Sequence, residues 1–121
     1  MSWWVSIEDE EERCMDVPLF CEGGTYAIGG DTKACLNVTY NYGVHYWRVL
    51  GTKEGLKSLD GLRPEEALEY LERGVEALGD EVDEDYWKAS EGNAKRPLVI
   101  LAEWCRLALK TERLDLRMRV I

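Results

Sequence analysis

His45, the single histidine of the chain, is the first residue to consider for chemistry. A histidine titrates near neutral pH and acts as a general acid or base when a second group orients it. Glu22, Asp31 or a cysteine could be that group. However, His45 stands in an aromatic stretch, residues 42–47, which is typical of a packing residue, and no activated nucleophile accompanies it. We therefore expect no catalytic residue, with a small enzyme using His45 as an alternative.

The chain has four cysteines: Cys14, Cys21, Cys35 and Cys105. The first three could form a metal site with His45 by residue type, but their spacings match none of the paired-ligand patterns of zinc sites. The N-terminal residues 1–5 lack the basic start and apolar core of a signal peptide. We therefore expect a cytoplasmic protein in a bacterial host, with free thiols, no metal and no cofactor.

Polar and apolar side chains alternate over residues 36–42, which predicts a strand. One face of that strand would carry Asn37, Thr39 and Asn41, because successive strand residues point to opposite faces. We name these three residues the polar row. Two amides and a hydroxyl offer donors and acceptors to a nucleotide base or a peptide backbone. The alternative is a solvent-facing surface or structural hydrogen bonds to neighbouring loops.

Two other groups are candidate binding residues. Asn93 and Arg96 stand at the predicted start of a helix, where free N–H groups favour an anion. The second group is an acidic stretch: Asp80, Glu81, Asp83, Glu84 and Asp85. This stretch lacks the glycine and the distal glutamate of a calcium loop, so we interpret it as a solvated linker. If the polar row is structural, the acidic stretch becomes the expected functional surface.

Composition limits the classes of function. The chain has 121 residues, 45% of them hydrophobic and 32% charged, and a net charge of −9. That length predicts one domain with one core. The charge argues against general nucleic-acid binding, which needs clustered Lys and Arg. An acidic surface can mimic nucleic acid, steer toward a basic protein, or simply keep a domain soluble. No apolar run approaches the roughly 20 residues that span a membrane.

The first half of the chain has the pattern of a β-sheet. Residues 3–7 alternate and predict a first strand. Residues 14–21 predict an edge strand, because Pro18 cannot donate a main-chain hydrogen bond. Two glycine pairs inside residues 22–50 predict a hairpin, and a long alternating strand continues to the end of that segment. We therefore expect an N-terminal antiparallel sheet over the β-rich half, residues 1–50.

The second half has helical periods. Residues 64–78 carry a one-sided apolar stripe, and a proline suited to the first helical turn precedes it. Residues 93–110 are apolar nearly all round, which predicts a buried helix capped by Ser90 or Asn93. These two helices form the expected two-helix half, residues 62–110.

Together these elements predict one α+β domain, residues 1–121, in which the sheet packs on two C-terminal helices. Within the last segment, 111–121, strict alternation over 114–120 predicts a final strand or a tail. An unpaired alternating strand invites edge pairing, so a homo-oligomer through this strand is a further expectation. In the linker between the helices, Tyr86 and Trp87 should pack back onto the core.

Several short blocks follow one another in a fixed order between residues 22 and 109: Gly23-Gly24-Thr25-Tyr26, Gly29-Gly30, Leu36-Asn37-Val38-Thr39-Tyr40-Asn41-Tyr42, Leu78-Gly79-Asp80, Asp85-Tyr86-Trp87 and Glu91-Gly92-Asn93-Ala94-Lys95-Arg96. On these blocks the chain resembles a family of small uncharacterised proteins encoded by bacteriophages and prophages. It departs from the family pattern at Pro97 and after Leu109. The resemblance implies a phage context and no established activity.

Small, acidic, motif-poor phage proteins are often inhibitors of host defence. The leading hypothesis is therefore a non-enzymatic binding protein that inhibits bacterial anti-phage defence. It would bind an effector protein in the manner of an anti-CRISPR protein, or sequester a nucleotide immune signal. A phage structural or assembly accessory protein is the rival; repeats or heptads would favour it, and the sequence has neither.

Overall fold

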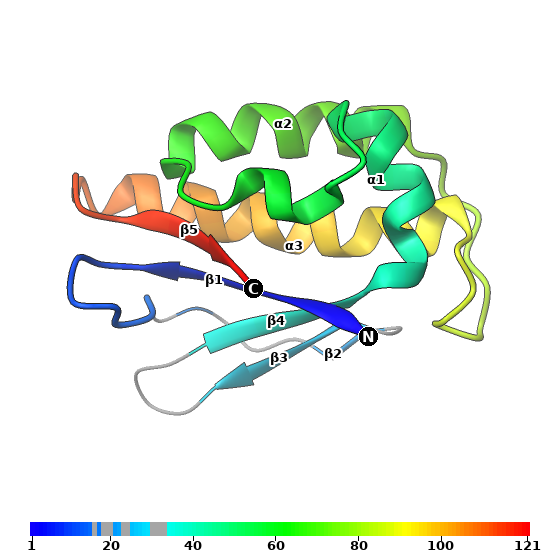
Figure 1. The fold of residues 1–121 in the computed structure, drawn as a ribbon, viewed down its shortest axis with the longest axis horizontal. Coiled ribbons are helices and arrows are strands. Elements are labelled where there is room, and N and C mark those ends of the chain that lie inside the picture. Colours follow the sequence, from blue (N-terminus) through cyan, green and yellow to red (C-terminus); the bar gives the residue numbers. More distant parts are fainter. Residues whose placement is uncertain (16, 18–20, 23–24, 30–33) are drawn as a thin grey trace.

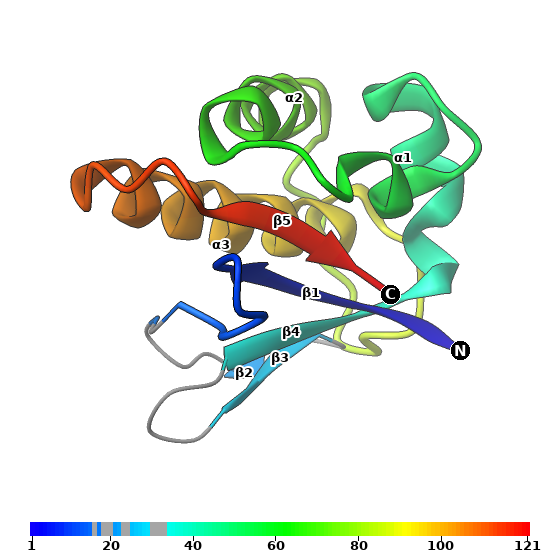
Figure 2. The same cartoon turned by 60° about the vertical axis from the view of Figure 1, so that its left-hand side comes forward.

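The computed structural model describes residues 1–15, 17, 21–22, 25–29 and 34–121 (Figure 1). Within those residues, five strands form one antiparallel sheet in the order β2-β3-β4-β1-β5. The strands are β1 (Ser2–Glu8), β2 (Cys21–Glu22), β3 (Thr25–Gly29), β4 (Ala34–Thr39) and β5 (Arg117–Val120). The helices are η1 (Tyr40–Tyr42), α1 (Gly43–Leu50), η2 (Gly55–Leu59), α2 (Pro64–Ala77) and α3 (Glu91–Lys110). Figure 2 shows the helices on one face of the sheet, so the predicted α+β architecture is confirmed.

The first strand, β1, lies between β4 and β5 in the sheet. Val5 of β1 is opposite Leu36 of β4 on one side and opposite Val120 of β5 on the other, and all three side chains are buried. Trp3, Val5 and Ile7 therefore face the helices, as their alternation predicts. The N-terminal strand β1 therefore pairs with two strands that come later in the chain, β4 and β5.

Helix α3 is the centre of the helical layer, as predicted. Leu98, Leu101 and Trp104 are each at most 1% exposed and lie in the same core cluster as the inward face of β1. The helix begins at Glu91, and its cap is Ser90, whose Oγ accepts the main-chain N–H of residue 93 at 3.2 Å. With this cap, Pro97 lies inside the helix rather than in its first turn.

The long strand predicted to reach residue 50 is wrong beyond Thr39. The Oγ1 of Thr39 accepts the N–H of Asn41 at 3.2 Å and caps η1, after which the chain continues into α1. Tyr42, Tyr46 and Leu50 are buried at four-residue spacing, which places them on one face of a helix. Packing of these three side chains against the core outweighs the strand preference of the aromatic and β-branched residues between them.

The predicted hairpin is present, because β2 pairs with β3 and β3 pairs with β4, both antiparallel. Its two turns, at 23–24 and 30–33, lie outside the described residues, and Asp31 lies there with them. Of the predicted strand 14–21, residues 16 and 18–20 also lie outside the description. Before them, Cys14 makes one bridge to Glu8.

The final strand is present, and its outer edge is occupied by the chain itself. The N–H of Met118 donates to the Leu62 carbonyl at 2.8 Å. The N–H of Val120 donates to Asp60 Oδ1 at 2.8 Å, and the Val120 carbonyl accepts from Lys57 Nζ at 2.6 Å. The connection between η2 and α2 therefore covers this edge. A second copy could pair with β5 only by displacing these hydrogen bonds.

Candidate functional site

The segment between α2 and α3, residues 79–90, runs along η1 and α1 at the right-hand end of Figure 1. We name it the acidic loop. Side chains of the neighbouring helices hold its main chain. Asn41 Nδ2 donates to the Trp87 carbonyl at 2.8 Å, and the Nε2–H of His45 donates to the Ala89 carbonyl at 2.6 Å. Asn41 and His45 are four residues apart, so both reach the loop from the same side of η1 and α1.

Tyr42 adds a third contact from the same segment, since its hydroxyl donates to the Tyr86 carbonyl at 2.6 Å. The Tyr42 side chain is fully buried, and this burial raises the pKa of its hydroxyl to about 12. The phenol therefore remains protonated and keeps donating at neutral pH. Tyr42 therefore connects the core to the loop at Tyr86, one of the exposed aromatic residues of the loop.

Asn93 holds the acidic loop from the other side. The side chain is fully buried, and its Nδ2 donates to the carbonyls of Asp83 at 3.1 Å, Asp85 at 3.4 Å and Lys88 at 3.1 Å. Its Oδ1 accepts from the Asp83 N–H at 3.3 Å. Asn93 was expected to contact a ligand, but these bonds make it the residue that shapes the loop.

The first turn of α3 fixes the beginning of the loop. The Gly92 N–H donates to the Glu81 carbonyl at 2.8 Å, and a Cβ at Gly92 would come within 2.5 Å of that oxygen. The Glu91 carboxylate accepts from the Gly79 N–H at 3.0 Å and lies 3.4 Å from the Arg48 guanidinium. The Gly79 hydrogen bond, assisted by Arg48, lowers the pKa of Glu91 below its usual value. Glu91 therefore stays ionised and keeps both contacts.

Four of the sequence blocks thus meet at one place in the structure. Leu78-Gly79-Asp80 leads into the loop and Asp85-Tyr86-Trp87 lies within it. The segments that hold the loop carry Tyr40-Asn41-Tyr42 and Glu91-Gly92-Asn93. Sequence reasoning identified Asn41 and Asn93 as ligand contacts. It missed the use of both amides to bind main-chain carbonyls, a role that the spacing of the residues does not reveal.

Large aromatic side chains are exposed on the loop and on the helix beside it. Trp47 is 59% exposed, Trp87 51% and Tyr86 47%. The rings of Tyr86 and Trp87 meet edge to face, with centroids 5.3 Å apart and planes at 84°. The expectation that these two residues pack back onto the core is wrong, because about half of each side chain is exposed and neither belongs to the core cluster. Val44 and Tyr40 continue the exposed apolar stripe along α1 and η1.

The loop that carries Tyr86 and Trp87 is also rich in carboxylates. Residues 79–90 contain five acidic residues and one lysine, a net charge of −4. Asp80, Glu81 and Glu84 are exposed, whereas Asp83 and Asp85 are partly covered. The ammonium of Lys88 lies 3.4 Å from Asp85 and 4.0 Å from Asp83. We name the whole region the aromatic-acidic surface: Tyr40, Val44, Trp47, Asp80, Glu81, Asp83, Glu84, Asp85, Tyr86 and Trp87.

The polar row does not exist as a row, because Asn41 lies in η1 and not on the strand. Asn37 is 8% exposed, and its Nδ2 donates to Ser2 Oγ at 2.6 Å. Thr39 caps η1. All three side chains therefore make structural hydrogen bonds, the alternative that the sequence left open.

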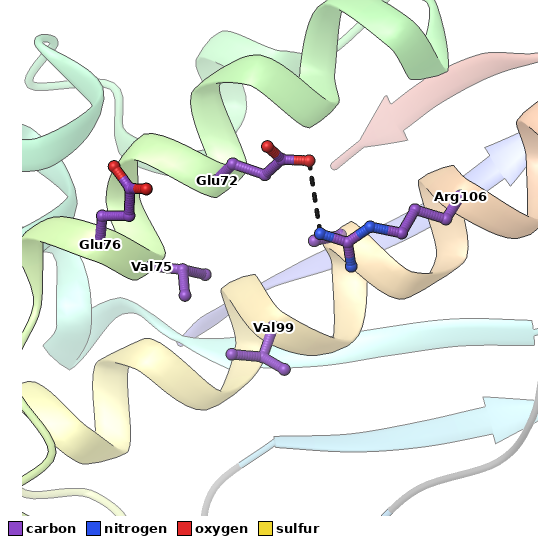
Figure 3. A pocket seen from close by; sticks show the side chains of 6 residues that line it. Glu72, Val75, Glu76, Val99 and Arg106 are labelled. Carbon is purple, nitrogen blue, oxygen red and sulfur yellow. Dashed lines mark hydrogen bonds and ion pairs between the residues drawn. The ribbon is translucent and has the colours of Figure 1, made fainter.

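Arg96 lines a hollow of about 310 Å³ whose wall also includes Asp80, Lys95 and Val99. The ammonium of Lys95 lies 2.7 Å from Asp80, so the acidic loop neutralises this cation. A second hollow of about 310 Å³ lies on the other side of Val99 (Figure 3). There an ion pair of 3.3 Å joins Arg106 of α3 to Glu72 of α2.

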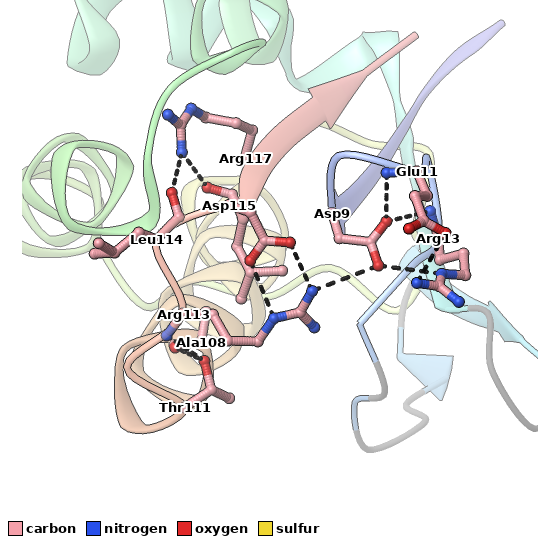
Figure 4. A network of polar contacts seen from close by, with 10 residues as sticks. Asp9, Glu11, Arg13, Ala108, Thr111, Arg113, Leu114, Asp115 and Arg117 are labelled. Atoms are coloured by element: carbon pink, nitrogen blue, oxygen red, sulfur yellow. Dashed lines mark hydrogen bonds and ion pairs between the residues drawn. The ribbon is translucent and has the colours of Figure 1, made fainter.

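A separate charged network ties the turn after β1 to the segment before β5 (Figure 4). Asp9 accepts from the N–H groups of Glu11 and Arg13, each at 2.9 Å, and lies 3.5 Å from the Arg113 guanidinium. Arg113 also pairs with Asp115 at 2.8 Å. The hydrogen bond from Arg113 lowers the pKa of Asp115, and that from the Arg13 N–H lowers the pKa of Asp9. These charges satisfy one another and stabilise the fold.

Among the described side chains, Cys14, Cys35 and Cys105 form no metal-binding group with His45. Cys14 and Cys35 are half-buried, and burial raises the pKa of the Cys35 thiol. Cys105 is buried in the core, and its pKa is raised to about 12. Across the described part of the chain, no group of three or more His, Cys, Asp or Glu residues could hold a metal ion. No helix among those residues is long and apolar enough to cross a membrane.

Comparison of the chain with protein-family models, with curated proteins and with solved structures found no significant match. A functional proposal therefore depends on the residues and geometry of this chain.

Proposed function

We propose that this protein is a non-enzymatic binding protein that inhibits a bacterial defence against bacteriophage by docking a defence protein on the aromatic-acidic surface. One observation carries the proposal: Tyr86 and Trp87 are about half exposed, and their rings meet edge to face on a loop whose main chain is held firmly, while the neighbouring helix α1 exposes Trp47. Exposed aromatic residues that gather in one place mark interaction sites, and Trp and Tyr dominate binding energies at interfaces.

The support of the acidic loop favours tight docking. Asn41, Tyr42 and His45 bind its carbonyls from one side, and Asn93 binds three more from the other. A loop fixed in this way loses little conformational entropy when a partner binds, so more of the contact energy appears as affinity. The exposed side chains of the acidic loop are therefore already positioned for contact before a partner binds.

The charge of the surface favours a protein partner over a nucleotide signal. A nucleotide is an anion, and the net charge of −4 over residues 79–90 repels it. Lys95, in the neighbouring hollow, is already paired with Asp80. A basic patch on an effector protein would instead be attracted, and electrostatic steering would speed its association.

His45 has a structural role at this surface. Its Nε2–H donates to the Ala89 carbonyl, so the imidazole supports the acidic loop. The phage context implied by the sequence resemblance makes a defence effector the first class of partner to test.

The test is a pull-down from bacterial hosts that carry defence systems, with the captured material analysed for both proteins and nucleotides. The Trp47→Ala/Trp87→Ala double variant removes two exposed anchors and should lose the captured protein while its thermal stability stays near wild type. Tyr70→Ala on α2 is the matched control, because Tyr70 is 40% exposed and lies outside the aromatic-acidic surface. A protein captured equally by all three forms, or a nucleotide as the sole ligand, would contradict the proposal.

A further inference from the structure

We infer that the partner presents an arginine-rich segment, with guanidinium groups that stack on the exposed rings and bind the surrounding carboxylates. The inference rests on the proposed function and specifies the chemistry of the partner. It requires that the surface offer aromatic faces and carboxylates side by side, which the acidic loop does.

The aromatic faces are available at the loop. In the edge-to-face pair of Tyr86 and Trp87, each ring is about half exposed. A guanidinium group is planar and weakly hydrated, so it stacks on such faces better than an ammonium group does. The chain shows this geometry within itself, because the Arg73 guanidinium carbon lies 5.5 Å from the centre of the Tyr70 ring.

The carboxylates are next to the rings in the sequence, because Asp83, Glu84 and Asp85 directly precede Tyr86 and Trp87. Asp83 and Asp85 hold the Lys88 ammonium, so these carboxylates already bind a cation of the chain itself. Glu81 and Glu84 are exposed and extend the negative surface outward. Carboxylates bind guanidinium groups in a two-pronged geometry that an ammonium group cannot match.

Charge also decides between a basic partner and a second copy of this chain. Two copies meeting at this surface would bring two loops of net charge −4 together, and like charges facing each other are costly. An arginine-rich segment has the opposite charge. Such segments are typical of proteins that bind phosphates and bases, where aromatic rings and cations line the site. The aromatic-acidic surface would occupy such a site in place of nucleic acid.

The experiment measures binding of two fluorescein-labelled peptides, nona-arginine and nona-lysine, by fluorescence anisotropy at about 0.1 M salt, where charges are partly screened. The peptides have equal charge, so charge alone gives equal affinity. We expect the arginine peptide to bind about three- to fivefold more tightly. The Tyr86→Ala/Trp87→Ala variant should remove this preference, and Trp87→Phe should keep most of it.

A charge variant separates the contribution of the carboxylates from that of the aromatic rings. Glu81→Gln/Glu84→Gln should weaken both peptides and reduce the salt dependence of binding. Glu65→Gln/Glu69→Gln on α2 is the matched control, because it removes two exposed carboxylates that lie outside the acidic loop. Equal affinity for the two peptides, or a preference that survives Tyr86→Ala/Trp87→Ala, would overturn the inference.

The outcomes distinguish this inference from the proposed function. If the two peptides bind equally while capture of the host protein still depends on Trp47 and Trp87, the proposed docking function is supported and the inference of an arginine-rich partner is refuted. If the arginine peptide is preferred but capture of no host protein depends on those tryptophans, the arginine preference of the surface is supported and the proposed function is refuted.

Discussion

Replacing Gly92 with alanine should destabilise the protein, although the same change stabilises an ordinary helix. Gly92 lies in the first turn of α3, and a helical alanine is favoured over glycine by about 1 kcal/mol. At this position, however, a Cβ would lie 2.5 Å from the Glu81 carbonyl oxygen and 2.8 Å from the Asp80 carbonyl carbon. The closer contact is 0.9 Å shorter than the 3.4 Å at which ordinary contact begins. Both neighbours are main-chain atoms, so the acidic loop itself must move.

The size of the effect follows from three contributions. Overpacking of this kind costs about 1–3 kcal/mol, and weakening of the Gly92–Glu81 hydrogen bond costs about 1 kcal/mol more. The gain in helix propensity offsets about 1 kcal/mol. The net loss in the free energy of unfolding is therefore about 1–3 kcal/mol. Urea denaturation followed by tryptophan fluorescence measures it as a lower midpoint with an unchanged slope.

Gly79→Ala is the matched control at the other end of the same contact region. A Cβ there would have Glu91 Oε1 as its nearest neighbour, at 3.7 Å, which is an ordinary contact. This variant should change stability by at most about 0.5 kcal/mol. If Gly92→Ala is as stable as the wild type or more stable, the reasoning that α3 shapes the loop through this close approach is refuted.

Three other changes test the fold. Asn93→Ala leaves part-buried main-chain carbonyls of the acidic loop without their partner, and should cost about 2–3 kcal/mol in urea denaturation; a loss below about 0.5 kcal/mol would contradict its role. Trp104→Ala opens a void beneath α3 and should cost about 3–5 kcal/mol, whereas Trp104→Phe should cost less, because Nε1–H is buried without a partner in the described part of the chain. Asp115→Asn should flatten the acid limb of the curve of Tm against pH. The hydrogen bond from Arg113 lowers the pKa of Asp115 in the folded state, so its stabilisation is complete above about pH 4 and is lost as the pH falls through the folded value. An unchanged acid limb would refute that contribution.

The elements with strong periodicity could be predicted from the sequence. The apolar stripe before Leu78 and the apolar run around Trp104 indicate α2 and α3, and alternation indicates β1 and β5. These patterns depend only on which side chains are buried, so they predict a helix or a strand without knowledge of the tertiary contacts. Helix α1 was not predicted, because the alternation that ends at Tyr42 fits a strand equally well. The four-residue spacing of Tyr42, Tyr46 and Leu50 was the signal for it.

The site was harder to predict than the fold. The sequence identified Asn41 and Asn93 as important polar residues, but whether an amide faces a ligand or a carbonyl depends on where the acidic loop lies. Exposure of Tyr86 and Trp87 also depends on that placement, because aromatic residues are buried more often than exposed. The acidic stretch itself was correctly placed as a connection between the two helices, since its charges cannot enter a core.

The most direct test of the central claim is phage plaquing on a panel of bacterial strains that each carry one defence system. Each strain expresses the wild-type protein, the Trp47→Ala/Trp87→Ala variant, or the Tyr70→Ala control, at matched levels and with matched thermal stability. We predict that the wild type and the control restore plaquing on at least one strain and that the double variant does not. Full restoration by the double variant would contradict the claim that the aromatic-acidic surface is the binding site.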